Sequence, residues 1–255
     1  MALAFASLGS GSKGNGTIVE GGSGCVLIDC GFSVKETERR LSRLGRSGED
    51  LSAILVTHEH SDHIRGVLPL ARKYRLPVMM TRGTAAAVAG MNGYEKLTLI
   101  APHQCFYVDS LEITPVTVRH DAREPVQFVI GRNQRKVGVL TDLGSITQNV
   151  IDYFDSCDGL LLEANHDQQL LLSGQYPYYL KQRVGGDWGH LNNYQSASLL
   201  SRIERRKIQT LVLGHISLKN NSWERISEAV SPYIETIGNV VYACQEQGFS
   251  WQVIE

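Results

Sequence analysis

Short apolar runs bounded by turn residues recur along the whole chain. They are rich in Val, Ile and Leu and mostly four to eight residues long, a pattern typical of buried β-strands. The early runs 18–20 and 25–28 flank the glycine-rich turn 21–24 and predict a hairpin. The predicted strands are residues 4–8, 25–30, 53–57, 77–80, 111–118, 126–131, 136–141, 159–163, 210–214, 240–243 and 250–253.

Longer stretches with apolar residues at helical spacing lie between these runs. They predict helices at residues 33–45, 64–74, 84–91, 146–154, 194–204 and 222–234. Strands and helices alternate in both halves without a regular βαβ order, which favours mixed sheets covered by helices. No linker or low-complexity stretch divides the chain, so we expect a single domain over residues 1–255. Residues 168–187 are the one long region of uncertain structure, and such loops are usually functional or disordered.

One of the predicted turns carries unusual chemistry. The strand 53–57 is followed directly by His58-Glu59-His60-Ser61-Asp62-His63. Neutral imidazole suits zinc, iron and similar metals, and a carboxylate adds a harder oxygen ligand. A solvated turn or a lone structural metal site is the alternative, but structural sites are usually closed and often use cysteine, and no cysteine is near. The turn therefore predicts the shared floor of two adjacent metal sites in a hydrolase.

Composition limits the partners and the cellular compartment that this metal chemistry could have. The chain has 42% hydrophobic and 20% charged residues and a net charge of −1, so no global positive field draws it to nucleic acid. Its five cysteines form no CxxC pair, which predicts free thiols in a reducing compartment. Residues 1–6 are apolar without a basic leader and predict a first strand. No apolar run reaches the length of a membrane span, so the cytoplasm is the expected location.

Three further candidate ligands follow predicted strands. His120 comes after the strand 111–118, Asp142 after 136–141, and His215 after 210–214. The carboxyl ends of strands at one sheet edge are where α/β folds place ligands and chemistry. Taken singly, each has an ordinary explanation as a surface, core or turn residue. Their joint order after the histidine-rich turn is what favours a metal site.

This order of motifs resembles the metallo-β-lactamase superfamily over nearly the whole chain. The resemblance implies an α/β fold with α+β character, a four-layer αββα sandwich, and two divalent ions, zinc, manganese or iron. It places the first metal on His58, His60 and His120. It places the second on Asp62, His63 and His215, with Asp142 as the bridging ligand.

A second group of motifs resembles nucleases within that superfamily. Leu161-Leu162-Glu163-Ala164-Asn165 and Gly189-His190-Leu191-Asn192-Asn193 are similar to motifs of tRNase Z-like nucleases. The segments 10–16, 163–167 and 176–184 resemble the YycJ/WalJ type of bacterial protein more closely, with Asn192 as a mild departure from a usual serine. The resemblance implies 5′-to-3′ exonuclease activity, with DNA preferred over RNA as the nucleic-acid partner. The runner-up is a hydrolase of a small ester, thioester or lactone on the same metals, and a metal-stabilised binding module without turnover is the third reading.

Four residues are candidates for the catalytic steps of phosphodiester hydrolysis. Asp142 is expected to hold the attacking water and Asp62 to accept its proton. His190 is the candidate acid for the leaving oxygen, oriented by Glu163. The plainer alternatives are a solvated strand end for Glu163 and a capping loop for His190. His166 either assists the site or packs locally.

Substrate contacts are predicted from aromatic and cationic residues. Tyr178, Lys181 and Arg183 lie in the uncertain region 168–187, where aromatic residues interleave with cationic ones. Such a mixture suits the stacking of nucleobases on aromatic rings together with cationic contacts to the phosphate backbone. A self-packed lid is the alternative. Lys13 lies in the Gly/Ser loop 10–16, which is either a phosphate cradle or a tight turn. An arginine-rich helix is most simply a solvated face; its arginines are Arg39, Arg40, Arg43 and Arg46.

Overall fold

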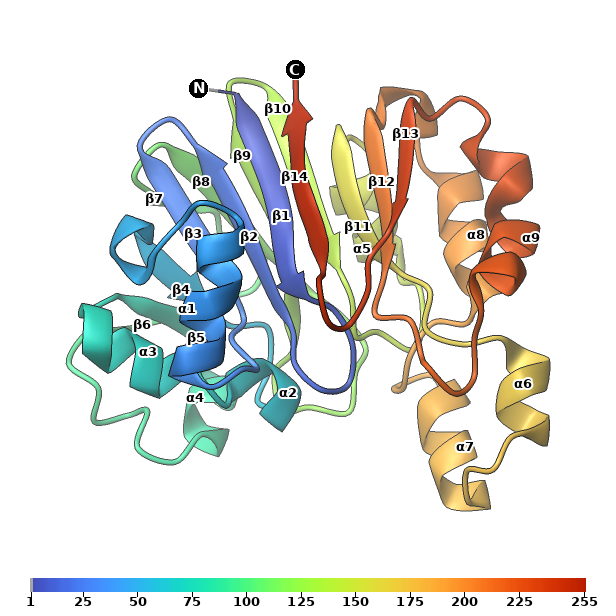
Figure 1. Cartoon of the computed structure of the whole chain (residues 1–255), viewed down its shortest axis with the longest axis horizontal. Coiled ribbons are helices and arrows are strands. Elements are labelled where there is room, and N and C mark those ends of the chain that lie inside the picture. The colour runs from blue at the N-terminus through green and yellow to red at the C-terminus, as the bar shows by residue number, and fades with distance from the viewer. Residues whose placement is uncertain (1) are drawn as a thin grey trace.

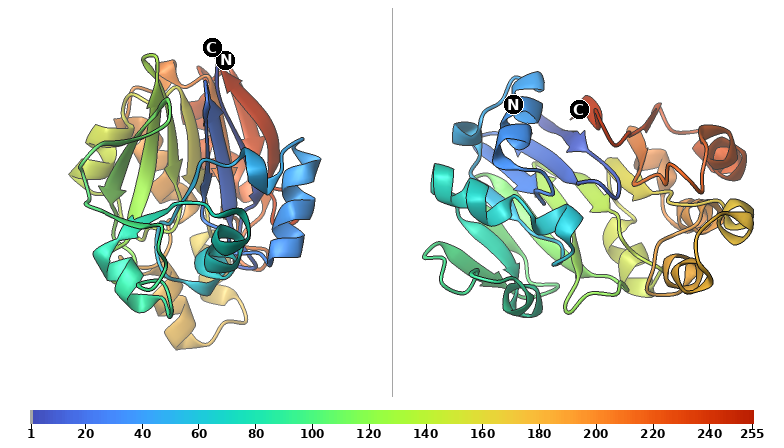
Figure 2. Two further views of the ribbon diagram at one scale, coloured as in Figure 1. Left: turned by 90° about the vertical axis from the view of Figure 1, so that its left-hand side faces the viewer. Right: turned by 60° about the horizontal axis from the view of Figure 1, so that its bottom comes forward.

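Two mixed β-sheets lie face to face with helices on both outer faces (Figures 1 and 2). The computed structural model describes residues 2–255, so Met1 of the predicted N-terminal strand segment lies outside them. The first sheet has the order β14 (Phe249–Ile254), β1 (Leu3–Gly9), β2 (Gly16–Gly21), β3 (Gly24–Ile28), β4 (Ala53–Leu55), β5 (Val78–Thr81) and β6 (Leu97–Ile100). The second has the order β13 (Asn239–Tyr242), β12 (Thr210–Gly214), β11 (Gly159–Glu163), β10 (Arg135–Leu140), β9 (Val126–Arg132), β8 (Leu111–Thr117) and β7 (Phe106–Val108).

Three apolar clusters hold four layers together. One lies between the sheets and includes Phe5 and Phe128, both fully buried. The second packs the outer face of the first sheet against α1 (Val34–Arg43), α3 (Val67–Tyr74) and α4 (Arg82–Ala87). The third packs the outer face of the second sheet against α5 (Gln148–Phe154), α8 (Asn193–Arg202) and α9 (Trp223–Ile234). The predicted αββα sandwich is therefore confirmed.

The sequence pattern missed some elements. The predictions did not include β6 and β7, which are outermost strands of only four and three residues. The helix expected at 64–74 is two helices, α2 (Ser61–Ile64) and α3, separated near Gly66. A Cβ at Gly66 would lie 2.0 Å from the Phe32 carbonyl oxygen, so the chain there packs backbone against backbone. The uncertain region contains α6 (Gln168–Ser173) and α7 (Tyr178–Gly185), which project together from the lower edge of the sandwich (Figure 1).

The arginine-rich helix is a solvated face only in part: Arg39 and Arg43 are exposed as expected, whereas Arg40 is buried. Arg40 is 4% exposed, and its Nη1 donates to the carbonyl oxygens of Leu8 and Gln245. Arg46 forms two hydrogen bonds of 2.7 Å with the carboxylate of Glu20. The Arg40 contacts fasten α1 to the end of β1 and to the turn between β13 and β14, and the Arg46 contact fastens the chain just after α1 to β2.

Two further expectations concern thiols and membranes. The five cysteines are free thiols, as predicted. Across residues 2–255, no helix has the length and apolar character needed to cross a bilayer.

Strand register brings distant residues to one edge of the sandwich. β10, β11 and β12 are parallel, and Leu140, Leu162 and Leu213 lie side by side in adjacent strands. The residues that follow these three strand ends are therefore neighbours, although they are far apart in sequence. The turn after β4 reaches the same edge from the facing sheet, which brings the histidine-rich motif to the second sheet (Figure 1).

Candidate metal centre

Imidazoles and carboxylates converge where the two sheets meet. Ligand atoms lie within 4.8 Å of one another in three overlapping groups. These groups are His58/His60/His120, His58/His63/Asp142 and Asp142/Glu163/His190/His215. Asp62 joins the second group through its Oδ2, which is 3.5 Å from His63 Nε2. The structure thus gathers in one place all seven residues that the sequence predicts as ligands.

Each of three histidines has one ring nitrogen held by an outer partner. The contacts are His58 Nδ1 to Thr57 Oγ1 at 2.9 Å, His63 Nδ1 to Asp29 Oδ2 at 2.8 Å, and His120 Nδ1 to the Gly189 carbonyl oxygen at 2.9 Å. This arrangement leaves the three Nε2 atoms as the inward-facing nitrogens, and outer partners of this kind orient metal-binding histidines. His58 Nε2 is buried without a hydrogen-bond partner among residues 2–255. Such an atom is expected where a ligand for a cation is held ready.

Asp29 and Asn15 support the cluster and were missed from the sequence. Asp29 accepts hydrogen bonds from the Thr57 backbone amide and hydroxyl as well as facing His63. Asn15 donates from Nδ2 to Asp62 Oδ2 at 3.2 Å. Asp29 has the left-handed φ of 61° directly after β3, which a sequence pattern does not show. Their roles depend on tertiary contacts with the histidine-rich turn.

Asp142 lies at the centre of the cluster and is 2% exposed. Its Oδ2 is 3.0 Å from His215 Nδ1 and 3.4 Å from His63 Nε2. Burial works to raise the pKa of Asp142, but these two imidazoles hold that pKa well below its usual range. Asp142 and His215 also have left-handed φ values of 54° and 53°. Non-glycine residues adopt this conformation rarely, and such strain is often found at functional sites.

The buried Glu163 and the partly exposed His190 form a pair beside Asp142. Glu163 Oε1 is 2.8 Å from His190 Nδ1 and 3.2 Å from His215 Nδ1. Its Oε2 accepts hydrogen bonds from the backbone amides of Leu143 and Leu191. Burial opposes ionisation, but His190 and His215 lower the pKa of Glu163 to about 2. The Glu163 carboxylate is held by two imidazoles and two backbone amides, and it therefore orients the His190 ring with Nδ1 toward Glu163.

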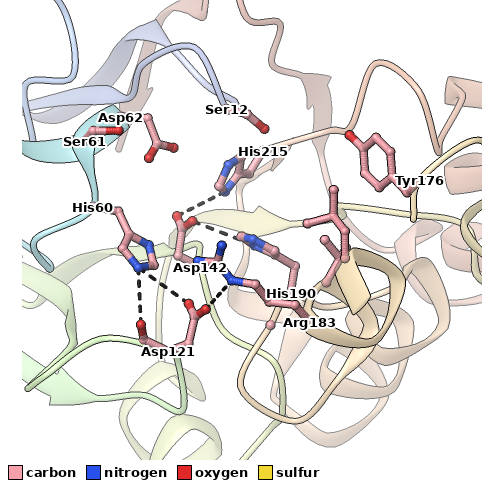
Figure 3. Close-up of a pocket in the computed structure, with 13 residues that line it drawn as sticks. Ser12, His60, Ser61, Asp62, Asp121, Asp142, Tyr176, Arg183, His190 and His215 are labelled. Carbon is pink, nitrogen blue, oxygen red and sulfur yellow. Dashed lines mark hydrogen bonds and ion pairs between the residues drawn. The ribbon is translucent and has the colours of Figure 1, made fainter. Parts of the chain in front are cut away.

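A cleft of about 360 Å³ opens over the cluster. Figure 3 shows Asp142, His190 and His215 on its floor and Ser12, Tyr176 and Arg183 around them. The Arg183 guanidinium, carried by α7, pairs with Asp121 through a 2.5 Å contact between Nε and Oδ2. Asp121 also lies 3.6 Å from His60 Nε2. This ion pair connects α7 to the metal-facing side of the cleft.

The four predicted substrate contacts do not share one surface. Arg183 lines the cleft, whereas Tyr178 and Lys181 line a second cavity on another side of α7. Lys13 lines a third cavity together with Arg40 and further residues. Ser12, Asp121 and Tyr176 line the cleft instead and were not among the predicted contacts. Only the folded position of α7 decides which of its side chains face the metals.

The Gly/Ser loop has few free backbone amides for a phosphate cradle. Gly11 donates to Asn15 Oδ1, Lys13 to Gln245 Oε1, and Gly14 to the Gly11 carbonyl oxygen. The loop supports the site through side chains, since Ser10 Oγ accepts a 2.8 Å hydrogen bond from the His215 amide. It serves as a tight turn between β1 and β2, which was the plainer of the two expectations.

Gly31 packs directly against the backbone of the turn that carries Asp62, so a substitution there should disturb the metal ligands. A Cβ at Gly31 would lie 1.8 Å from the Asp62 carbonyl oxygen and 2.8 Å from the Asn15 amide nitrogen. We expect Gly31→Ala to shift the Asp62 turn and to weaken metal binding about 10- to 100-fold, as loss of outer support does in other metal sites. Metal titration with a competing chelator measures this change. Gly93→Ala is the matched control, because a Cβ there meets only the Gly90 carbonyl oxygen at 3.9 Å; equal affinity of both variants would contradict the prediction.

The donor set fits divalent transition metals. It combines inward imidazole nitrogens with carboxylate oxygens, a mixture that suits zinc, iron and manganese. It is also open to the cleft on one side, as catalytic sites are and closed structural sites are not.

Comparisons with known proteins agree with this geometry. A family model described as "Beta-lactamase superfamily domain" matches residues 25–216. The chain is 34% identical over 241 residues to exodeoxyribonuclease YycJ of Bacillus anthracis, covering 93% of this chain and 91% of that protein. It is 35% identical over 222 residues to exodeoxyribonuclease WalJ of Streptococcus pneumoniae, covering 85% of this chain and 82% of that protein.

Solved structures show the same fold at low sequence identity. The metallo-β-lactamase fold protein YhfI from Bacillus subtilis aligns over 99% of both chains with a TM-score of 0.74 and 17% identity. The short form of human tRNase Z aligns over 99% of both chains with a TM-score of 0.68 and 15% identity. With the family match, the relatives and the metal-ligand geometry in agreement, the chain belongs to the metallo-β-lactamase superfamily and is a metal-dependent hydrolase of the YycJ/WalJ group.

Proposed function

We propose that this protein is a two-metal nuclease that degrades DNA from the 5′ end. The observation that carries the proposal is the pair formed by the buried Glu163 and the cleft-lining His190 beside Asp142, with His190 Nδ1 3.8 Å from Asp142 Oδ1. A phosphodiester leaves a poorly stabilised alkoxide, which needs a positioned acid, whereas a thioester or activated lactone does not. The names of the relatives in Bacillus anthracis and Streptococcus pneumoniae, both exodeoxyribonucleases, support DNA as the substrate.

The proposed metal ligands are those of the converging cluster. His58, His60 and His120 would hold one ion, and Asp62, His63 and His215 the other, with Asp142 shared between them. Zinc, manganese or iron would fit this set. When bound, the ions supply charge neutralisation at the phosphate and a lowered pKa for the attacking water.

The remaining chemistry belongs to side chains of this chain. Asp62 is 22% exposed at its side chain and lines the cleft, so it can accept the proton of the attacking water. His190 delivers a proton to the leaving oxygen, and Glu163 keeps its ring oriented through the contact with Nδ1. Arg183 offers a guanidinium that suits bidentate contact with phosphate once Asp121 is displaced.

Other contacts extend the proposal beyond the scissile phosphate. Ser12 and Tyr176 at the cleft are candidates for hydrogen bonding and stacking with the nucleotide that is cleaved. Lys13, Tyr178 and Lys181 stay candidates for contacts with parts of the strand outside the cleft. We assign the enzyme to the cytoplasm, in line with its free thiols.

The test is cleavage of matched DNA and RNA strands that carry a 5′-phosphate and a 5′-terminal label. The metal-loaded protein is expected to release labelled mononucleotide from DNA first, and chelator treatment is expected to abolish release until zinc or manganese is restored. Activity should fall as salt rises, because phosphate contacts are screened. Internal fragments as first products would contradict the exonuclease assignment. No cleavage of either strand, together with turnover of a lactone or thioester, would favour the runner-up activity.

A further inference from the structure

A second cavity lies beside α7 and belongs to no step of the proposed mechanism. It has a volume of about 660 Å³ and is bounded by α6, α7 and the segments that lead into α6 and α8. Leu171, Leu172 and Tyr178 supply apolar walls. Gln168, Gln182 and Asn192 supply polar groups. A mostly apolar hollow with a few convergent polar groups is the usual form of a small-ligand site.

The cavity contains a buried imidazole without a role in the metal cluster. His166 is 1% exposed, and its Nδ1 has no hydrogen-bond partner in the described part of the chain. Burial lowers the pKa of His166 to about 4, so the ring is neutral near pH 7. A neutral imidazole has one donor and one acceptor nitrogen. Its Nε2 is the nitrogen on the cavity side, 3.8 Å from the position of a Cβ at Gly185, so Nε2 can pair with a ligand in the cavity while Nδ1 stays enclosed.

Glycine at position 185 keeps this cavity open. A Cβ there would lie 3.2 Å from Leu171 Cδ2 and 3.8 Å from His166 Nε2, so a larger side chain would project between the wall and the imidazole. The entrance is held by Lys181, whose Nζ donates to the Leu172 carbonyl oxygen at 2.6 Å and so ties α7 to α6. Tyr178 and Leu172 are 75% and 63% exposed at the cavity, which leaves apolar surface for a ligand to cover.

We propose that this cavity binds one nucleobase of the substrate strand, next to the nucleotide that is cleaved. The inference rests on the proposed nuclease function. α7 separates the two hollows: Arg183 and Leu180 face the metal cleft, while Tyr178 and Gln182 face the cavity. A strand that leaves the cleft across α7 therefore reaches the cavity. There the tyrosine ring and leucines stack against a base, and His166 pairs with its hydrogen-bonding edge.

The test uses DNA strands in which a single abasic site is moved one position at a time from the 5′ end. For the wild-type enzyme we expect one position, and no other outside the cleaved nucleotide, at which base removal raises KM about tenfold. Gly185→Leu is expected to raise KM on intact DNA by a similar factor and to lose sensitivity to that abasic site. Its turnover of bis(p-nitrophenyl) phosphate, which reports the metal centre alone, should stay unchanged.

Two controls keep the inference separable from the nuclease proposal. Gly93→Leu makes the same exchange at an exposed glycine far from both hollows and should behave as wild type. His166→Phe keeps ring size but removes both nitrogens, so it should reduce discrimination among the four bases at the sensitive position. Cleavage of DNA without any abasic-sensitive position, or with sensitivity retained in Gly185→Leu, would overturn the base pocket alone. No nucleic-acid cleavage by wild type would remove the proposed function and this inference with it.

Discussion

Asp142→Ala is expected to lower DNA cleavage by at least about 100-fold and to remove at least one bound ion per chain. Loss of an outer partner of a metal ligand already costs about 10- to 100-fold, and Asp142 is in the centre of the cluster itself. Its carboxylate faces both His215 and His63, so its removal leaves these two imidazoles without their shared counter-charge. Initial rates on 5′-labelled DNA and metal content by mass spectrometry measure the two effects.

The matched control is Asp152→Asn, a change at an exposed aspartate of α5 outside the cluster. It should keep wild-type rate and metal content. Asp142→Asn keeps the side-chain shape and separates loss of charge from loss of volume. Circular dichroism of each variant shows whether the fold persists. An Asp142→Ala protein that binds two ions per chain and cleaves DNA at the wild-type rate would rule out the bridging assignment.

His190→Gln is expected to slow DNA hydrolysis by about 10²- to 10⁴-fold, the range that a positioned acid contributes. The effect should depend on the leaving group. DNA releases an alkoxide that needs a proton, whereas a p-nitrophenyl phosphodiester releases a stable phenolate. We therefore expect only a small loss on the p-nitrophenyl substrate. Turnover numbers of the variant on both substrates, compared with wild type, give the ratio that tests the role.

Glu163→Gln is a second, separate variant to compare with His190→Gln, because Glu163 acts through His190 as a positioning residue. It should show the same leaving-group dependence with a smaller loss, since the amide of Gln can still contact His190 Nδ1 but orients the ring less strongly than the carboxylate does. Metal content should be measured in both variants, because Glu163 also faces His215. Equal losses on DNA and on the p-nitrophenyl substrate would contradict an acid role and indicate damage to the metal cluster instead.

Local pattern was sufficient for most of the fold. The strand that ends in the histidine-rich turn, the apolar residues Val34 and Leu41 at helical spacing in α1 and the helical pattern over residues 222–234 are all properties of neighbouring residues. β6 and β7 escaped prediction because short outer strands such as these carry little periodic signal. Arg40 was misjudged because its burial comes from carbonyl groups of Leu8 and Gln245, which are distant in the chain.

The sequence by itself determined mixed sheets covered by helices and the order of the ligand motifs, because strand periodicity and closely spaced histidines are local features of the chain. The four-layer sandwich and the pairing of Glu163 with His190 were expectations implied by the resemblance to the superfamily. Only the tertiary structure decided that Asp29 and Asn15 support the histidine-rich turn, and that α7 turns Arg183 toward the cleft and Tyr178 away from it. These outcomes depend on strand register and helix orientation, which bring together side chains that no local pattern connects.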